Sequence, residues 1–197
     1  MARMANTHLL YLHGFRSSPL SAKAQLTAAR VAARHPGVTW WCPQLPPSPR
    51  EALALVQRGI ADWPAGRMAV IGSSLGGFYA SWVAHAKHCP SVLLNPAVDP
   101  ARDLARYIGE QTAWHDPEAR FFFRAEYIDE LRAWDVRGQA PGGAELLLAM
   151  QGDEVLDWRE MVERYPQARQ VVLPGGDHAL SVYPEWVDAV LEFCQLA

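Results

Sequence analysis

The sequence predicts a single α/β domain over residues 1–197, with about six mostly parallel strands in one sheet and helices on both of its faces. Short apolar runs alternate with segments of helical spacing along the chain, which is the pattern of a parallel sheet built from strand–helix–strand units. The runs are apolar almost throughout, as expected for strands that are covered on both faces. At 197 residues, half of them hydrophobic, the chain has the length of one domain and enough apolar side chains for a full core.

These two patterns define the elements in chain order. Apolar runs of four to six residues predict the strands, at 8–12, 38–42, 68–72, 91–94, 145–150 and 170–173. Helical spacing of apolar residues predicts the helices, at 21–34, 49–61, 75–88, 158–165 and 184–194.

Two stretches interrupt the alternation. Residues 42–50 contain four prolines, which remove backbone donors and fix φ, so we expect an extended loop that ends at the next helix. Residues 99–143 are too long for one crossover helix and are rich in aromatic side chains. We expect this segment to form two or three short helices, a lid-like insertion over one edge of the sheet.

Composition and charge exclude several classes of function. Eighteen Lys and Arg against 21 Asp and Glu give a net charge of −3, without the basic excess that nucleic-acid binding requires. The three cysteines form no C-x-x-C pair, which argues against a zinc site or a disulfide framework and favours a reducing compartment. The apolar stretches are far shorter than the roughly 20 residues of a membrane span, and residues 1–7 lack the pattern of a signal peptide. We therefore expect a cytoplasmic protein with no membrane span and no nucleic-acid partner.

The motif that carries chemistry follows the third predicted strand. Gly72-Ser73-Ser74-Leu75-Gly76 matches G-x-S-x-G, in which a sharp strand-to-helix turn exposes the central serine at a helix N-terminus. The glycines two positions before and after Ser74 remove the clashes that side chains would cause there. The alternative reading is a glycine-rich turn without chemistry. A phosphate-binding P-loop is excluded because the motif lacks the Lys-Ser/Thr ending.

A serine nucleophile needs a base, and His178 is the predicted one. It lies in the loop 174–178, directly after the last predicted strand, and so at the same sheet edge as Ser74. His85 and His88 share a helix face, but no acidic residue stands at that spacing, so we expect no metal site there.

The acid that orients the base should lie between Ser74 and His178 in the chain. Asp153 is our choice because it comes first after the glycine turn that ends the fifth strand. Asp99, after the fourth strand, is the main competitor. Glu154 should point away, Asp157 is placed to cap the following helix, and Asp177 is adjacent to the histidine, where successive side chains diverge.

The developing oxyanion needs preorganised donors, and two backbone amides are available. One belongs to Leu75, directly after the nucleophile, and the other to Phe15, in the loop after the first strand where Gly14 lets the backbone turn. Arg16 in the same loop is a candidate substrate contact, or a residue that caps the next helix. His13 is expected to hold the turn.

Aromatic side chains of the segment 99–143 are candidates for an apolar acyl pocket. Trp114 and Phe121 are the residues that we assign to substrate binding, with packing of the lid onto the core as the equal alternative.

Taken together, these blocks resemble a known family. YLHGFRSSPLSAKA, CPQLPP, IGSSLGGFYA, LNPAV, GDEVLD and GGDHA are similar to the small bacterial esterases of the YqiA type, within the α/β-hydrolase superfamily. The resemblance implies a compact α/β-hydrolase fold without a large cap domain, acting on carboxylic esters, including short-chain and acyl-CoA thioesters. Carried over residue by residue, it puts the nucleophile on Ser74, the acid on Asp153, the base on His178 and the oxyanion amides on Phe15 and Leu75.

The sequence thus predicts a serine esterase that hydrolyses short- to medium-chain acyl esters through an acyl-enzyme, with a small-molecule acyl ester or thioester as its partner. No metal or organic cofactor is required. An acyl-CoA thioesterase, an acyltransferase or a peptidase would use the same residues, and a non-catalytic binding protein is the alternative of another class.

Overall fold

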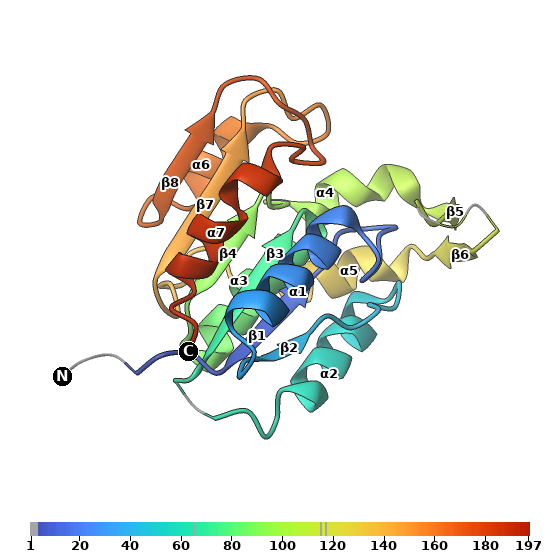
Figure 1. Ribbon diagram of the computed structural model, residues 1–197. Helices are drawn as coiled ribbons and strands as arrows, with labels where there is room; N and C mark the ends of the chain where they lie inside the picture. Colours follow the sequence, from blue (N-terminus) through green and yellow to red (C-terminus); the bar gives the residue numbers. More distant parts are fainter. Residues whose placement is uncertain (1–3, 65, 115, 117) are drawn as a thin grey trace.

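A parallel sheet runs through the centre of the molecule in the computed structural model, which describes residues 4–64, 66–114, 116 and 118–197 (Figure 1). Within these residues the sheet has six strands, and every pairing in it is parallel. The strand order is β2 (Thr39–Trp41), β1 (His8–Leu12), β3 (Met68–Ser73), β4 (Ser91–Leu94), β7 (Glu145–Met150) and β8 (Arg169–Leu173). The prediction of an α/β fold with about six parallel strands is confirmed, and each strand lies within one residue of the apolar run that predicted it.

Helices cover both faces of this sheet, as Figure 1 shows. α1 (Ala22–Arg34) and α7 (Tyr183–Phe193) pack together on one face. The other face carries α2 (Pro49–Gly59), α3 (Leu75–Lys87), α4 (Pro100–Leu104), α5 (Glu126–Ala133) and α6 (Trp158–Arg164). All five predicted helices are present.

Alternate residues of each central strand enter two separate cores. In β1, Leu9 and Tyr11 join the core under α1 and α7, whereas Leu10 and Leu12 join the core on the opposite face. All four side chains are fully buried. The strands therefore read as continuous apolar runs because neither face of the sheet meets water.

The segment 99–143 differs in part from its prediction. The expected short helices are present as α4, the 3-10 turn η1 (Ala105–Tyr107) and α5, but an antiparallel hairpin lies between them. Its strands β5 (Gly109–Thr112) and β6 (Arg120–Phe123) pair with each other and stand out on the right of Figure 1. In β6, the side chains of Phe121–Phe123 alternate as in a strand, with Phe123 fully buried and Phe122 60% exposed.

Among the described residues, no helix combines the length and the apolar character that a membrane span requires.

Candidate active site

Ser74 sits on a sharp turn between β3 and α3. Its φ of 56° and ψ of −122° lie outside the regions that residues with a β-carbon favour. The turn is so tight that a β-carbon on Gly76 would lie 1.9 Å from the carbonyl oxygen of Leu12, and one on Gly72 would lie 2.1 Å from that of Gly76. Only glycine fits at these two positions, which is the geometry expected of a G-x-S-x-G turn.

A chain of hydrogen bonds joins Ser74, His178 and Asp153. His178 Nε2 is 3.0 Å from Ser74 Oγ, and His178 Nδ1 is 2.8 Å from Asp153 Oδ2. With the ring proton on Nδ1, the imidazole donates to the carboxylate and accepts from the serine hydroxyl. The three residues follow the C-terminal ends of β3, β8 and β7 respectively, where parallel strands meet at one sheet edge.

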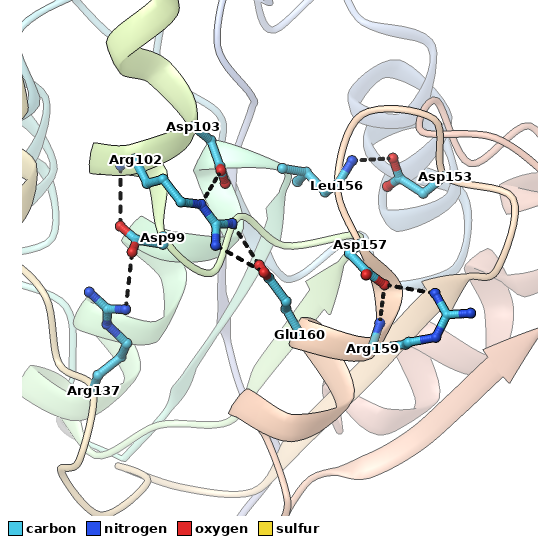
Figure 2. Close-up of polar contacts among 9 residues, drawn as sticks. All are labelled: Asp99, Arg102, Asp103, Arg137, Asp153, Leu156, Asp157, Arg159 and Glu160. Carbon is cyan, nitrogen blue, oxygen red and sulfur yellow. Dashed lines mark hydrogen bonds and ion pairs between the residues drawn. The ribbon is translucent and has the colours of Figure 1, made fainter.

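Backbone N–H groups hold the Asp153 carboxylate in the orientation in which it bonds His178. Its side chain is fully buried, and its Oδ1 accepts hydrogen bonds from the backbone N–H groups of Val155, at 2.8 Å, and Leu156, at 2.9 Å. Figure 2 shows the second of these bonds. The other oxygen is thus left free to accept from His178.

The competing acids have other partners. Asp99 caps α4 by accepting from the Arg102 N–H at 3.2 Å and pairs with Arg137 at 3.4 Å, whereas Asp157 caps α6 (Figure 2). Asp99 and Asp157 stand at helix N-termini, where a carboxylate is favourable without any contact with the His178 ring.

Glu154 and Asp177 form hydrogen bonds with the His178 backbone and with Ser181, respectively. Glu154 Oε2 accepts from the His178 N–H at 2.9 Å, so this side chain points toward the loop and not away from it as the sequence suggested. Asp177 accepts from the Ser181 hydroxyl and N–H, and these hydrogen bonds lower the pKa of its carboxyl. Among the described residues, Asp153 is the acid that bonds the His178 ring.

The loop after β1 passes directly alongside the nucleophile. A β-carbon on Gly14 would lie 3.1 Å from Ser74 Cβ and 3.5 Å from its Oγ, which brings the following residue, Phe15, to the site. Leu75 is the first residue of α3, where the N–H has no acceptor within the helix and faces outward from its positive end. The backbone segments of both predicted oxyanion amides therefore border Ser74.

His13 holds this loop in place. Its buried ring accepts from the Leu45 N–H at 3.1 Å through Nε2 and donates through Nδ1 to the Gly14 carbonyl at 3.0 Å. The ring thereby ties the loop to the proline-rich stretch 42–50, which matches the structural role expected for it.

Two cavities lie next to the candidate nucleophile. The smaller, of about 180 Å³, is lined by Ser74, His178, Leu104, Tyr107 and Leu156, among others. The larger, of about 510 Å³, is lined by Phe15, the proline-rich loop and Tyr79.

The predicted substrate residues are divided between these cavities. Arg16 lines both cavities, Trp114 lines the smaller one and Phe121 lines the larger one. Phe15 lines both cavities and packs edge-on against the Phe121 ring, with centroids 5.9 Å apart. The sequence assigned Trp114 and Phe121 to one acyl pocket, whereas in the structure they line different cavities.

Asn95 supports the histidine loop and was not found from the sequence. Its side chain is buried at the end of β4, where it donates to the carbonyls of Asp177, at 3.1 Å, and His178, at 3.3 Å. Its Oδ1 accepts from the Met150 N–H at 2.9 Å, at the end of β7. The available signal was a polar residue directly after a buried strand, within the LNPAV block.

Lys23 is a second residue that the sequence did not single out. From α1 it donates to the carbonyl of Ala179, which follows the candidate base. Partial burial lowers the pKa of its ammonium group to about 8, although the charges of Asp177 and Asp153 oppose this shift. Lys23 thus ties the histidine loop to the helix layer.

In the part of the chain that the structure describes, no three His, Cys, Asp or Glu side chains are grouped so that they could hold a metal ion.

Solved structures with this architecture include several enzymes that act on esters. Est1E from Butyrivibrio proteoclasticus, solved with ferulic acid bound, superposes with a TM-score of 0.74 at 16% identity, covering 96% of this chain and 88% of its own. The esterase domain of a Rhodothermus marinus protein has a TM-score of 0.69 at 21% identity, with coverages of 96% and 86%. The mouse α/β hydrolase domain-containing protein 10 has a TM-score of 0.67 at 15% identity, with coverages of 96% and 91%. These similarities establish the α/β-hydrolase fold that the sequence motifs implied.

A family model gives the closer relationship. The model of the uncharacterised protein family UPF0227 matches residues 8–195, from the first strand to the end of the last helix. This is the YqiA family that the sequence blocks resemble. The chain therefore belongs to UPF0227.

Proposed function

We propose that this protein is a serine esterase that hydrolyses carboxylic esters with short- to medium-chain acyl groups through an acyl-enzyme. The observation that carries the proposal is the unbroken hydrogen-bond chain from Ser74 Oγ through the His178 imidazole to the buried Asp153 carboxylate. A hydroxyl in such a chain loses its proton to the imidazole as it attacks a carbonyl.

The first half of the reaction acylates the enzyme. Ser74 Oγ attacks the ester carbonyl, and His178 Nε2 accepts the hydroxyl proton. The Phe15 and Leu75 amides then stabilise the oxyanion, a contribution of about 3 kcal/mol for each donor. When the tetrahedral intermediate collapses, the imidazolium gives its proton to the leaving alcohol.

The second half repeats this sequence with water. His178 removes a proton from the water that attacks the acyl-enzyme, and returns it to Ser74 Oγ as the carboxylic acid leaves. Asp153 keeps the imidazole in the tautomer that both halves require and stabilises its protonated form.

The smaller cavity supports a short acyl group. Its volume of about 180 Å³ is small beside the roughly 300 to 1,000 Å³ of most ligand pockets, which favours a short acyl chain. Its apolar lining, which includes Leu104 and Leu156, suits methylene groups.

Labelling with a fluorophosphonate tests the nucleophile. We expect the probe to label the wild type and not Ser74→Ala, and hydrolysis of p-nitrophenyl butanoate to fall at least about a thousandfold in this variant. Ser73→Ala is the matched control because Ser73 is the adjacent serine but forms no hydrogen bond with His178. Labelling that persists in Ser74→Ala would overturn the proposal.

A further inference from the structure

Two arginines line the cavity that contains Ser74 and His178. Arg16 comes from the loop after β1, and Arg106 comes from η1 in the lid-like segment. The remaining charged side chain of the lining, apart from the titratable His178, is that of Asp103.

Arg16 is held rigidly in place. Its Nε–H donates to the Thr112 carbonyl at 2.6 Å, its guanidinium carbon lies 4.1 Å from the centre of the Trp114 ring, and its own carbonyl accepts from the Trp114 N–H at 2.8 Å. Its backbone has a φ of 61°, which costs energy for a residue with a β-carbon and persists only where the surroundings enforce it. The terminal nitrogens of Arg16 form no hydrogen bond with a described residue.

Arg106 likewise has no acidic partner among the described residues. Its guanidinium carbon lies 5.0 Å from the centre of the neighbouring Tyr107 ring. Arg106 is exposed, and no ion pair with a described residue neutralises its charge.

Asp103 is already engaged by a different arginine. Arg102 Nε donates to Asp103 at 2.8 Å, and the Arg102 nitrogens Nη1 and Nη2 bind both oxygens of Glu160, at 2.9 and 2.7 Å (Figure 2). Arg102 is shared between Asp103 and Glu160, and Asp103 Oδ2 is buried without a hydrogen-bond partner among the described residues. Two arginines, Arg16 and Arg106, against one aspartate still leave the cavity lining net positive, in a protein whose net charge is −3.

We propose that the substrate of this esterase carries a carboxylate group, which Arg16 and Arg106 bind while the ester carbonyl lies at Ser74. A guanidinium group presents paired N–H donors that match a carboxylate. Because the cavity is small, about 180 Å³, we expect the carboxylate to lie only a few bonds from the ester. Two substrate types fit, the monoester of a short dicarboxylic acid and the ester of a short hydroxy acid. The inference rests on the proposed esterase activity.

Two pairs of matched esters test the inference and separate the two substrate types. Monomethyl glutarate and methyl pentanoate differ by a carboxylate in the acyl part, and 3-(butanoyloxy)propanoate and propyl butanoate differ by one in the alcohol part. Initial rates measured by pH-stat titration give kcat/KM for each ester. We expect the anionic ester of one pair to exceed its neutral partner by about tenfold or more, as a charge-assisted hydrogen bond contributes.

Substitutions of Arg106 and Arg16 test whether these residues cause the preference for anionic esters. Arg106→Gln should lower the anionic-to-neutral ratio of kcat/KM by about tenfold, and Arg16→Lys should lower it less because the charge remains while the paired donors are lost. Arg124→Gln is the matched control because Arg124 lines neither cavity, and its ratio should equal that of the wild type.

The two proposals fail in different ways. Ratios near one for both pairs in the wild type, or ratios that Arg106→Gln and Arg16→Gln leave unchanged, would overturn the carboxylate inference while Ser74-dependent hydrolysis of the neutral esters continues. If the wild type hydrolyses none of the four esters in a Ser74-dependent way, the esterase proposal itself is overturned.

Discussion

Ser74 occupies a strained backbone conformation that its surroundings enforce. Its N–H donates to the Leu94 carbonyl at 3.0 Å, and its own carbonyl accepts from Gly77 at 2.8 Å and from Ala97 at 2.9 Å. These bonds join the turn to β4 and to the loop that follows it. They hold a φ of 56° that costs about 1 to 3 kcal/mol in a residue with a β-carbon.

Removal of the β-carbon should therefore stabilise the fold. We expect Ser74→Gly to unfold at a higher urea concentration than Ser74→Ala, with a free energy of unfolding about 1 kcal/mol larger. Both variants lack the hydroxyl, so their difference reports the backbone strain less the roughly 0.4 to 1 kcal/mol by which glycine favours the unfolded chain. A Ser74→Gly variant that is less stable than Ser74→Ala by that amount would show that the turn is not strained.

The role of the acid is testable with two equivalent substitutions. Asp153→Asn keeps the shape of the side chain but cannot hold the His178 tautomer, so kcat should fall by about 10³- to 10⁴-fold. Asp99→Asn should stay within about twofold of the wild type, since asparagine also caps α4. Both values come from hydrolysis of p-nitrophenyl butanoate, and the opposite order of the two variants would make Asp99 the acid.

For single residues, the sequence predicted the candidate site wherever the backbone geometry allows only one residue type. Gly72 and Gly76 point to Ser74 because no other residue fits those positions. The sequence did not identify Asn95 because its three hydrogen bonds join segments that are far away in the chain, and no local pattern encodes them. The division of Trp114 and Phe121 between two cavities likewise depends on packing that the sequence does not display.

At the level of elements, one buried carboxylate joins α2 to α5. Glu130 of α5 accepts from the Ser48 hydroxyl at 2.6 Å and from the Arg50 N–H at 3.1 Å, and it forms an ion pair with the Arg50 guanidinium. Burial opposes ionisation of Glu130, but these hydrogen bonds and the Arg50 charge outweigh it and lower the pKa of the carboxyl.

The pH dependence of stability follows from the sign of this shift. A lowered pKa in the folded state stabilises the protein above the pKa of the unfolded carboxyl, about 4.3, and this stabilisation is lost as the pH falls further. We expect Glu130→Gln to lower the free energy of unfolding by about 1 to 3 kcal/mol at pH 7, and by less at pH 3.5. Urea unfolding at the two pH values measures both, and a difference that grows on acidification would contradict the assignment.

The regular elements were predictable because burial on two faces leaves a direct trace in the sequence. The strands of the central sheet matched their apolar runs to within a residue. The hairpin β5–β6 was not predicted because its strands have four residues each, and because the exposed Phe122 between Phe121 and Phe123 hides the alternation typical of a strand. Its position is determined by contacts with Arg16, which are tertiary.

Across the whole molecule, the site depends on the ends of β3, β4, β7 and β8 being brought together. Asn95 connects three of these strand ends. It follows β4, it accepts from the Met150 N–H at the end of β7, and it donates to carbonyls of the His178 loop after β8. It acts through the histidine and is thus a positioning residue.

We expect Asn95→Ala to lower kcat by about 10- to 100-fold with little change in KM, because the substrate cavity is unaffected while the base loses its support. Asn6→Ala is the matched control. Asn6 is also buried and its side chain donates to the Cys194 carbonyl at 2.7 Å, but it lies at the opposite end of the strands. Loss of stability in both variants with unchanged kcat in both would reduce Asn95 to a structural residue.

The position of β8 at the edge of the sheet has a consequence for how activity arises during synthesis. The nucleophile follows β3, the acid follows β7, and the base follows β8, which pairs only with β7. A nascent chain that has emerged as far as β7 can present Ser74 and Asp153, but His178 has not yet been added to connect them. On the proposed function, we therefore expect activity to appear only after β8 and the loop that follows it have docked. In a refolding experiment, ester hydrolysis should report docking of the final strand, while helix formation measured by circular dichroism reports earlier events.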